Sequence, residues 1–370
     1  MVWPQLFRST LTLSAGMRSQ RISVVFCLYC MADAKGSGVE RVGANLRDLR
    51  ALRYDPPGHA KQGARRTTFQ SALEQCEQFL AAARGAGYAT RPVQLFYALS
   101  QAGRALVAAS PRIGNQAWRV SGHGLTANTN AAAVADVAVT ATKAGLFPSV
   151  AVALGIECLV PDEPVALREL WPLLPESIRV PLRADALLPV LMFSQAGWPE
   201  ATEFSGAQIC WIPGRVKDLY GDDPARVQEH LSLYPALREC TLRLSQPMGK
   251  VQWSSPGLGL RVEVEWLNGS PPLMLHDKRN LDELGVVSYK AADDFVVTPA
   301  IGSMSAGLHP FLALWAVLLG LSSLARYEPA AWSKMIDIDT SAEANAIENL
   351  LDEAISSVPD AALHLLASFR

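Results

Sequence analysis

The stretch Phe69–Leu106 reads FQSALEQCEQFLAAARGAGYATRPVQLFYALSQAGRAL and contains two helical patterns separated by a glycine-rich break. In the first pattern, apolar residues recur at spacings of three and four, as they do on one face of an amphipathic helix: Phe69, Leu73, Cys76, Phe79 and Leu80. Gly85 and Gly87 then end this helix. The second pattern starts at Pro92 and is nearly all apolar, which predicts a buried helix up to Ala109.

Outward from this stretch, the chain divides into zones of different character. Residues 36–112 are expected to be helical, residues 113–304 rich in strands, and residues 305–370 helical again. Alternation with period two in Val134–Thr142 and Arg261–Leu267 is typical of half-buried strands, and the many loop residues favour antiparallel pairing. We therefore predict an α+β fold in which the N- and C-terminal helical zones pack together around the strand-rich middle region.

The final zone contains three predicted helical segments. The first covers 308–326, the second covers 341–356 with Thr340 or Ser341 as its cap, and a separate short helix follows Pro359. The apolar run Phe311–Ala325 has no charge, but it is shorter than the roughly 20 residues that cross a bilayer. A buried core helix is the better interpretation, so no membrane association is expected.

Residues 1–35 form an extension that we set apart from the fold. Its pattern favours a disordered extension or a mis-assigned start, with Met17 or Met31 as the true first residue. A secretory signal built on the short apolar run 22–30 is the weaker alternative. The pair Cys27 and Cys30 within this extension stands alone, so reduced thiols in a cytoplasmic protein are expected for all six cysteines.

Composition limits the function classes. The chain has 370 residues, 49% hydrophobic and 18% charged, with a formal net charge of -2, which excludes a protein held to nucleic acid by bulk positive charge. Residues 35–66 nevertheless carry eight basic side chains against three acidic ones. The common phosphate-loop, dinucleotide, serine-hydrolase and zinc-protease motifs do not occur, so we predict no cofactor and no metal site.

Arg104 is the first candidate site residue, because it interrupts an otherwise apolar helix. A guanidinium is rarely buried without an anionic or carbonyl partner. Tyr97 and Gln101 precede it on the same stretch, so one interpretation is an anion site on this helix face. The interpretation that we favour is a structural ion pair between Arg104 and the acidic C-terminal zone, where residues 337–370 hold seven acids.

His123 is the second candidate, since Gly122 and Gly124 flank it in a predicted tight turn. An imidazole there suits acid–base chemistry or phosphate binding, although a loop histidine bonded to a carbonyl is an alternative. Arg326 and Tyr327 end the apolar helix and are further candidates for ligand binding. For Arg326, interaction with the helix dipole is a sufficient structural explanation.

Three stretches together resemble the YaaC-like family of bacterial proteins. They are Phe69–Leu106, Trp118–Leu125 (WRVSGHGL), and Pro299–Gly302 with His309–Pro310 and Leu321–Trp332 (LSSLARYEPAAW). The resemblance spans about residues 40–368 and by itself implies no reaction. The helix Phe96–Leu106 with the following Gly-His-Gly is also similar to helical domains of the HEPN type, many of which act on RNA or nucleotides. The chain departs from their Arg-x4-6-His spacing, since three residues separate Arg119 from His123.

Two function classes follow. In the first, the protein is a non-catalytic interaction or regulatory protein and the candidate residues are structural. In the second, it is a HEPN-like factor directed at RNA or nucleotides, in which Arg104 holds phosphate and His123 takes part in proton transfer. Whether the protein is an enzyme stays open at this level, and a nucleotide, an RNA or another protein is the expected partner.

Overall fold

A computed structural model describes most of the chain: residues 38–114, 116–186, 188–194, 206–242, 244–245, 248–251, 253, 260–266, 285–289 and 295–370. The predictions made for residues 1–35, including the Cys27–Cys30 pair, lie outside the described residues.

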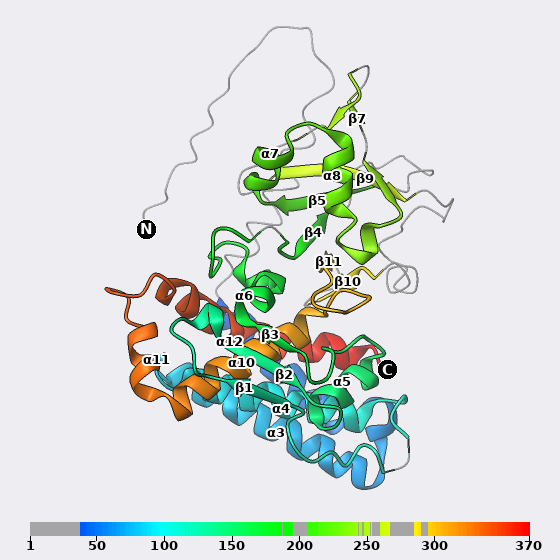
Figure 1. Cartoon of the computed structure of the whole chain (residues 1–370). Helices are drawn as coiled ribbons and strands as arrows, with labels where there is room; N and C mark the ends of the chain where they lie inside the picture. The colour runs from blue at the N-terminus through cyan, green and yellow to red at the C-terminus, as the bar shows by residue number, and fades with distance from the viewer. Residues whose placement is uncertain are drawn as a thin grey trace, which may run out of the picture.

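A layer of helices from both ends of the chain forms the larger part of the fold (Figure 1). These helices are α2 (Gly38–Tyr54), α3 (Gly63–Gly85), α4 (Arg91–Ala109), α10 (Pro310–Tyr327), α11 (Pro329–Met335) and α12 (Ala344–Ala367). The nearly all-apolar α4 lies at the centre and packs against α3, α10 and α12. The N- and C-terminal helices therefore share one core, and together with the strands between them they confirm the α+β class.

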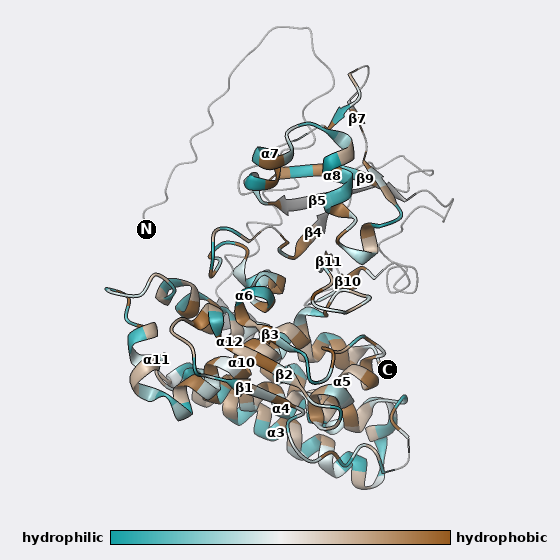
Figure 2. Cartoon of the chain, in the orientation of Figure 1, coloured by the Kyte–Doolittle hydropathy of each residue, from teal (hydrophilic) through white to brown (hydrophobic). Residues whose placement is uncertain are grey.

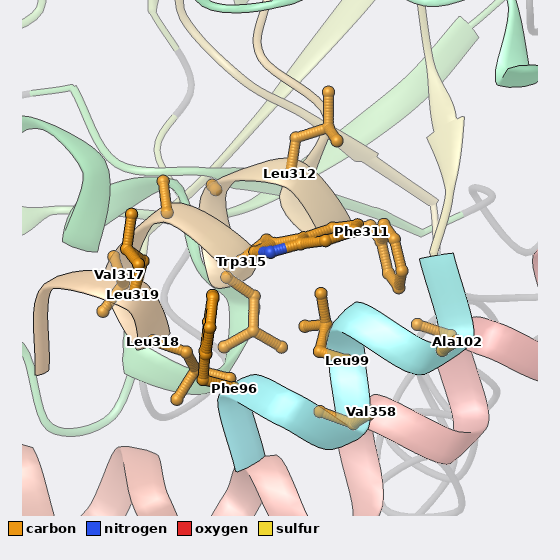
Figure 3. Packing of buried hydrophobic residues seen from close by; sticks show 14 of the residues in the cluster. Phe96, Leu99, Ala102, Phe311, Leu312, Trp315, Val317, Leu318, Leu319 and Val358 are labelled. Atoms are coloured by element: carbon orange, nitrogen blue, oxygen red, sulfur yellow. The ribbon is translucent and has the colours of Figure 1, made fainter. Parts of the chain in front are cut away.

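Helices α4 and α10 approach each other closely in this core. A Cβ atom on Gly103 would lie 2.2 Å from Cη2 of Trp315, so only glycine leaves room for the indole ring there. Figure 3 shows Phe311, Trp315 and Leu318 of α10 facing Phe96, Leu99 and Ala102 of α4. Close packing of this kind aligns the two helices and places the last residues of α10 beside the first turns of α4.

Helix α10 is the apolar segment singled out by the sequence, and Figure 2 draws it among the hydrophobic elements of the helical layer. It is long and apolar enough to cross a membrane by length and composition, but 83% of that window is buried inside the protein. The expected core helix is thus confirmed.

An ion pair joins the start of α4 to the acidic C-terminal zone. The guanidinium of Arg91 pairs with Asp352 of α12, and the hydroxyl of Tyr88 donates to the same carboxylate over 2.9 Å. The Arg91 guanidinium also lies 4.6 Å from the centre of the Tyr88 ring. Arg91, and not Arg104, is therefore the arginine that ties α4 to the acidic zone.

A small antiparallel sheet covers α10. Its strands are β1 (Leu125–Asn128), β2 (Ala138–Ala141) and β3 (Pro164–Ala166), in the order β1-β2-β3. Helix α5 (Leu146–Leu154) connects β2 to the loop before β3 and packs on α4. These elements contribute buried side chains to the same core as the helices.

A six-stranded antiparallel sheet lies above the helical layer in Figure 1 and has a second hydrophobic cluster. Its strand order is β10-β11-β4-β5-β9-β6, from β4 (Leu191–Ser194), β5 (Gly206–Ile212), β6 (Cys240–Leu242), β9 (Leu260–Trp266), β10 (Val287–Ser288) and β11 (Phe295–Val297). Helices α7 (Gly214–Tyr220) and α8 (Pro224–Leu231) contribute to this cluster. The remaining short elements are the hairpin β7 (Leu244–Ser245) and β8 (Lys250–Val251), α6 (Leu167–Leu170), and 3-10 turns at Gly58–Lys61, Val134–Asp136, Trp171–Leu173, Pro175–Ser177 and Pro235–Leu237.

Three local predictions were wrong. Val134–Thr142 is not one strand, because Val134 and Ala135 are both buried in a 3-10 turn and only Ala138–Ala141 forms a strand. The C-terminal zone has one continuous helix, α12, with Pro359 inside it instead of a break. Neither Thr340 nor Ser341 is the cap residue of α12, since the helix starts at Ala344 after Glu343. Buried residues on both sides of Pro359 pack on the same core, which outweighs the lost hydrogen bond at the proline.

A candidate oxyanion site at the junction of α4 and α10

Three basic side chains from separate parts of the chain come together where α4, α10 and the Gly-His-Gly segment meet. They are Arg104 of α4, His123 of the segment and Arg326 of the last turn of α10, and we call them the basic cluster. Both arginines lie close enough to His123 to influence its protonation. The structure thus brings together residues that the sequence singled out one by one.

Arg104 is half-buried and is held by a backbone carbonyl. Its Nη1 donates to the carbonyl oxygen of Val120 over 3.0 Å, which ties α4 to the segment just before His123. Among the residues that the structure describes, Arg104 forms no ion pair. The predicted ion pair with the acidic C-terminal zone is therefore not what the structure shows.

The backbone around His123 is fixed by the start of α5. The N–H groups of Leu146 and Phe147 donate to the carbonyls of Gly122 and His123 over 3.1 and 2.9 Å. Gly122 and Gly124 both have positive φ, at 75° and 78°, as the predicted tight turn requires. At Gly124 a side chain would also collide with Pro148, because a Cβ atom there would lie 2.5 Å from its Cδ.

The His123 side chain is exposed at the surface but rests against two aromatic rings of α4. Its ring centre lies 5.2 Å from that of Phe96 and 6.3 Å from that of Tyr97. Partial burial lowers the pKa of His123 below its usual range, and the positive charges of Arg326 and Arg104 lower it further. The imidazole is consequently mostly neutral at pH 7.

Arg326 forms a hydrogen bond through its Nε atom, and no hydrogen bond of its terminal amino groups is seen among the described residues. Its Nε donates to the carbonyl of Ser322 over 3.1 Å, which is the helix-terminus role expected for this residue. Its guanidinium carbon lies 6.0 Å from the centre of the Phe96 ring and 4.8 Å from that of Tyr327. Within the described part of the chain no carboxylate neutralises it.

Tyr97 and Gln101 complete the surroundings of the cluster on α4. The Tyr97 ring stacks on that of Phe79 at 5.4 Å, with an interplanar angle of 23°, so its position is fixed by α3. The Oε1 atom of Gln101 is buried and has no hydrogen-bond partner among the described residues.

Sequence reasoning missed the role of Phe96, which contacts both His123 and Arg326. A phenylalanine in an apolar helix is indistinguishable from an ordinary core residue, so no local signal marked it.

Several of the basic side chains counted over residues 35–66 have structural partners. Arg50 and Arg53 pair with Glu77 and Glu74, and Arg65 donates to backbone carbonyls at the end of α4.

Other chemistry-bearing features lie apart from the cluster. No group of three or more potential metal ligands occurs among the described residues. Burial raises the pKa of Cys76 to about 12 and that of Cys158 to about 11, so both are protonated thiols at pH 7. An open hollow of about 1050 Å³ lies between α11 and the loops around residues 131–133, 182–185 and 340–343, and none of the predicted site residues lines it.

The geometry defines an α+β protein with a basic cluster at a helix junction, in which neither arginine pairs with a carboxylate of the described residues. The family model described as YaaC-like Protein matches residues 48–366, so the chain belongs to the YaaC-like family. No curated protein and no solved structure matches the chain.

Proposed function

We propose that the protein is a non-catalytic regulatory binding protein, whose ligand carries a phosphate group held by the basic cluster. The observation that carries the proposal is the meeting of Arg104, His123 and Arg326 without a carboxylate partner for either arginine among the described residues. Charge-assisted hydrogen bonds from guanidinium groups are the strongest that a protein offers to an oxyanion.

The state of His123 also supports an anion as the ligand. Two neighbouring positive charges disfavour the imidazolium in the free protein. A bound phosphate offsets those charges, so the imidazole takes up a proton and becomes a further donor.

Isothermal titration calorimetry with inorganic phosphate and ribose 5-phosphate tests the proposal. Arg104→Ala is expected to weaken binding by about tenfold or more, since it removes a charged hydrogen-bond donor. Arg119→Ala is the matched control, because Arg119 lies in the same segment but is exposed over Trp118. Absence of binding by the wild type, or an equal loss in both variants, would contradict the proposal.

A second candidate function is the HEPN-like one, in which the protein acts on RNA or nucleotides. The neutral imidazole of His123 favours it, because a neutral histidine beside two arginines is able to accept a proton from a hydroxyl group. Incubation of RNA and nucleotides with wild type and with His123→Ala separates the two functions. Turnover by the wild type that is lost in a folded His123→Ala variant supports the enzyme, whereas binding without turnover supports the regulatory protein.

A further inference from the structure

Tyr327 is a large aromatic side chain left at the surface beside the basic cluster. It is the last residue of α10 and is 66% exposed. Glu328 follows with a non-helical backbone, and Pro329 starts α11. This sharp change of direction leaves the Tyr327 ring outside the core, whereas large aromatic rings are ordinarily buried.

Arg326 connects this ring to the cluster. Its guanidinium carbon lies 4.8 Å from the centre of the Tyr327 ring, and the same residue lowers the pKa of His123. The Nε atom is already used by the carbonyl of Ser322, so the terminal amino groups are the donors that remain for a ligand. A group bound to them lies next to an exposed aromatic face.

We infer that Tyr327 is a stacking platform for a nucleobase, so that the phosphate-bearing ligand is a nucleotide. The inference rests on the proposed phosphate binding at the basic cluster. A nucleotide combines a flat aromatic ring and a phosphate within one small molecule, which matches an exposed ring and a basic cluster joined by Arg326. Stacking of a base on an aromatic side chain raises affinity by about tenfold, and it tolerates any base because every base has an aromatic face.

Calorimetric titration of the full chain with ribose 5-phosphate and with AMP, GMP, CMP and UMP tests this inference. The variants are Tyr327→Ala, which removes the ring, and Tyr327→Phe, which keeps it. Tyr54→Ala is the matched control, because Tyr54 is another strongly exposed tyrosine, at the end of α2. Unchanged thermal unfolding of each variant is the condition for comparing affinities.

We expect the wild type to bind nucleotides about tenfold more tightly than ribose 5-phosphate. Tyr327→Ala abolishes this difference but leaves ribose 5-phosphate binding unchanged, while Tyr327→Phe and Tyr54→Ala retain the difference. Equal affinity of the wild type for nucleotides and ribose 5-phosphate overturns the inference and leaves the phosphate site standing. If ribose 5-phosphate and nucleotides all fail to bind, both the inference and the proposed function are wrong.

Discussion

Arg104 donates a hydrogen bond to the carbonyl of Val120, three residues before His123. The side chains of Arg104 and His123 belong to one basic cluster. A long apolar helix and a glycine-flanked loop are thereby joined at the point where their polar side chains reach the surface. This hydrogen bond and the shared cluster lead us to expect effects on anion binding, on the protonation of His123 and on the stability of the loop.

The first prediction concerns the pH dependence of anion binding. His123 has a lowered pKa in the free protein, and a bound anion raises it, so binding takes up a proton. Affinity for sulfate is therefore expected to increase as the pH falls from about 8 to about 5, by at most about tenfold per pH unit. Sulfate is the suitable probe because it stays a dianion over this range, and calorimetry at each pH gives the measurement. A His123→Ala variant should show a flat profile; a profile as steep as that of the wild type would exclude His123 from the site.

The second prediction concerns the two glycines around His123. Gly122→Ala places a side chain at positive φ in open space, with an expected cost of about 1 kcal/mol. Gly124→Ala adds a collision with Pro148 to the same strain, so its loss of stability should be clearly larger. Chemical denaturation of both variants checks the order, and equal losses would mean that the turn relaxes away from α5.

The third prediction concerns the contact between α4 and α10. Gly103→Ala pushes a methyl group into the Trp315 ring, and overpacking of this kind costs about 1–3 kcal/mol. Gly85→Ala, at the exposed end of α3 with open space around it, is the control and should be neutral or slightly stabilising. Thermal unfolding of the two variants gives the comparison. If Gly103→Ala were as stable as Gly85→Ala, the described helix packing would be incorrect.

The fourth prediction concerns the tie between α4 and α12. Arg91 is 12% exposed at its side chain and Asp352 is 55% exposed, so the pair is partly shielded from water. Arg91→Ala removes the ion pair and the stacking on Tyr88, and we expect a loss of about 1 kcal/mol measured by urea denaturation. Arg168→Ala breaks an exposed pair with Asp136 and should cost less.

Much of the helical layer was predictable from the sequence. The apolar periodicity of residues 67–84 and the near-continuous apolar run of 92–109 fall inside observed helices, and the run of 308–326 matches α10 except for Leu308 and His309, which precede the helix. The reason is physical, since a helix that buries one face or its whole surface needs apolar residues in that pattern. Pro359 misled the prediction because its cost is local, whereas the packing of α12 that outweighs it is tertiary.

The candidate site was predictable only in parts. Arg104, His123 and Arg326 each drew notice because they are polar residues in apolar or glycine-rich surroundings. Their meeting depends on the antiparallel packing of α10 on α4 and on the contacts between α5 and the Gly-His-Gly segment, which no local pattern encodes. Phe96, which links His123 to Arg326, has the sequence signature of a core residue.

The most direct test of the basic cluster is an NMR titration of the His123 imidazole in histidine-labelled protein. We expect a pKa below the usual value of about 6.5 in the free wild type. The pKa should increase on removal of the neighbouring charge in Arg104→Ala, and separately when phosphate is added to the wild type. An ordinary pKa for His123 that neither Arg104→Ala nor phosphate changes would contradict the cluster and the binding function built on it.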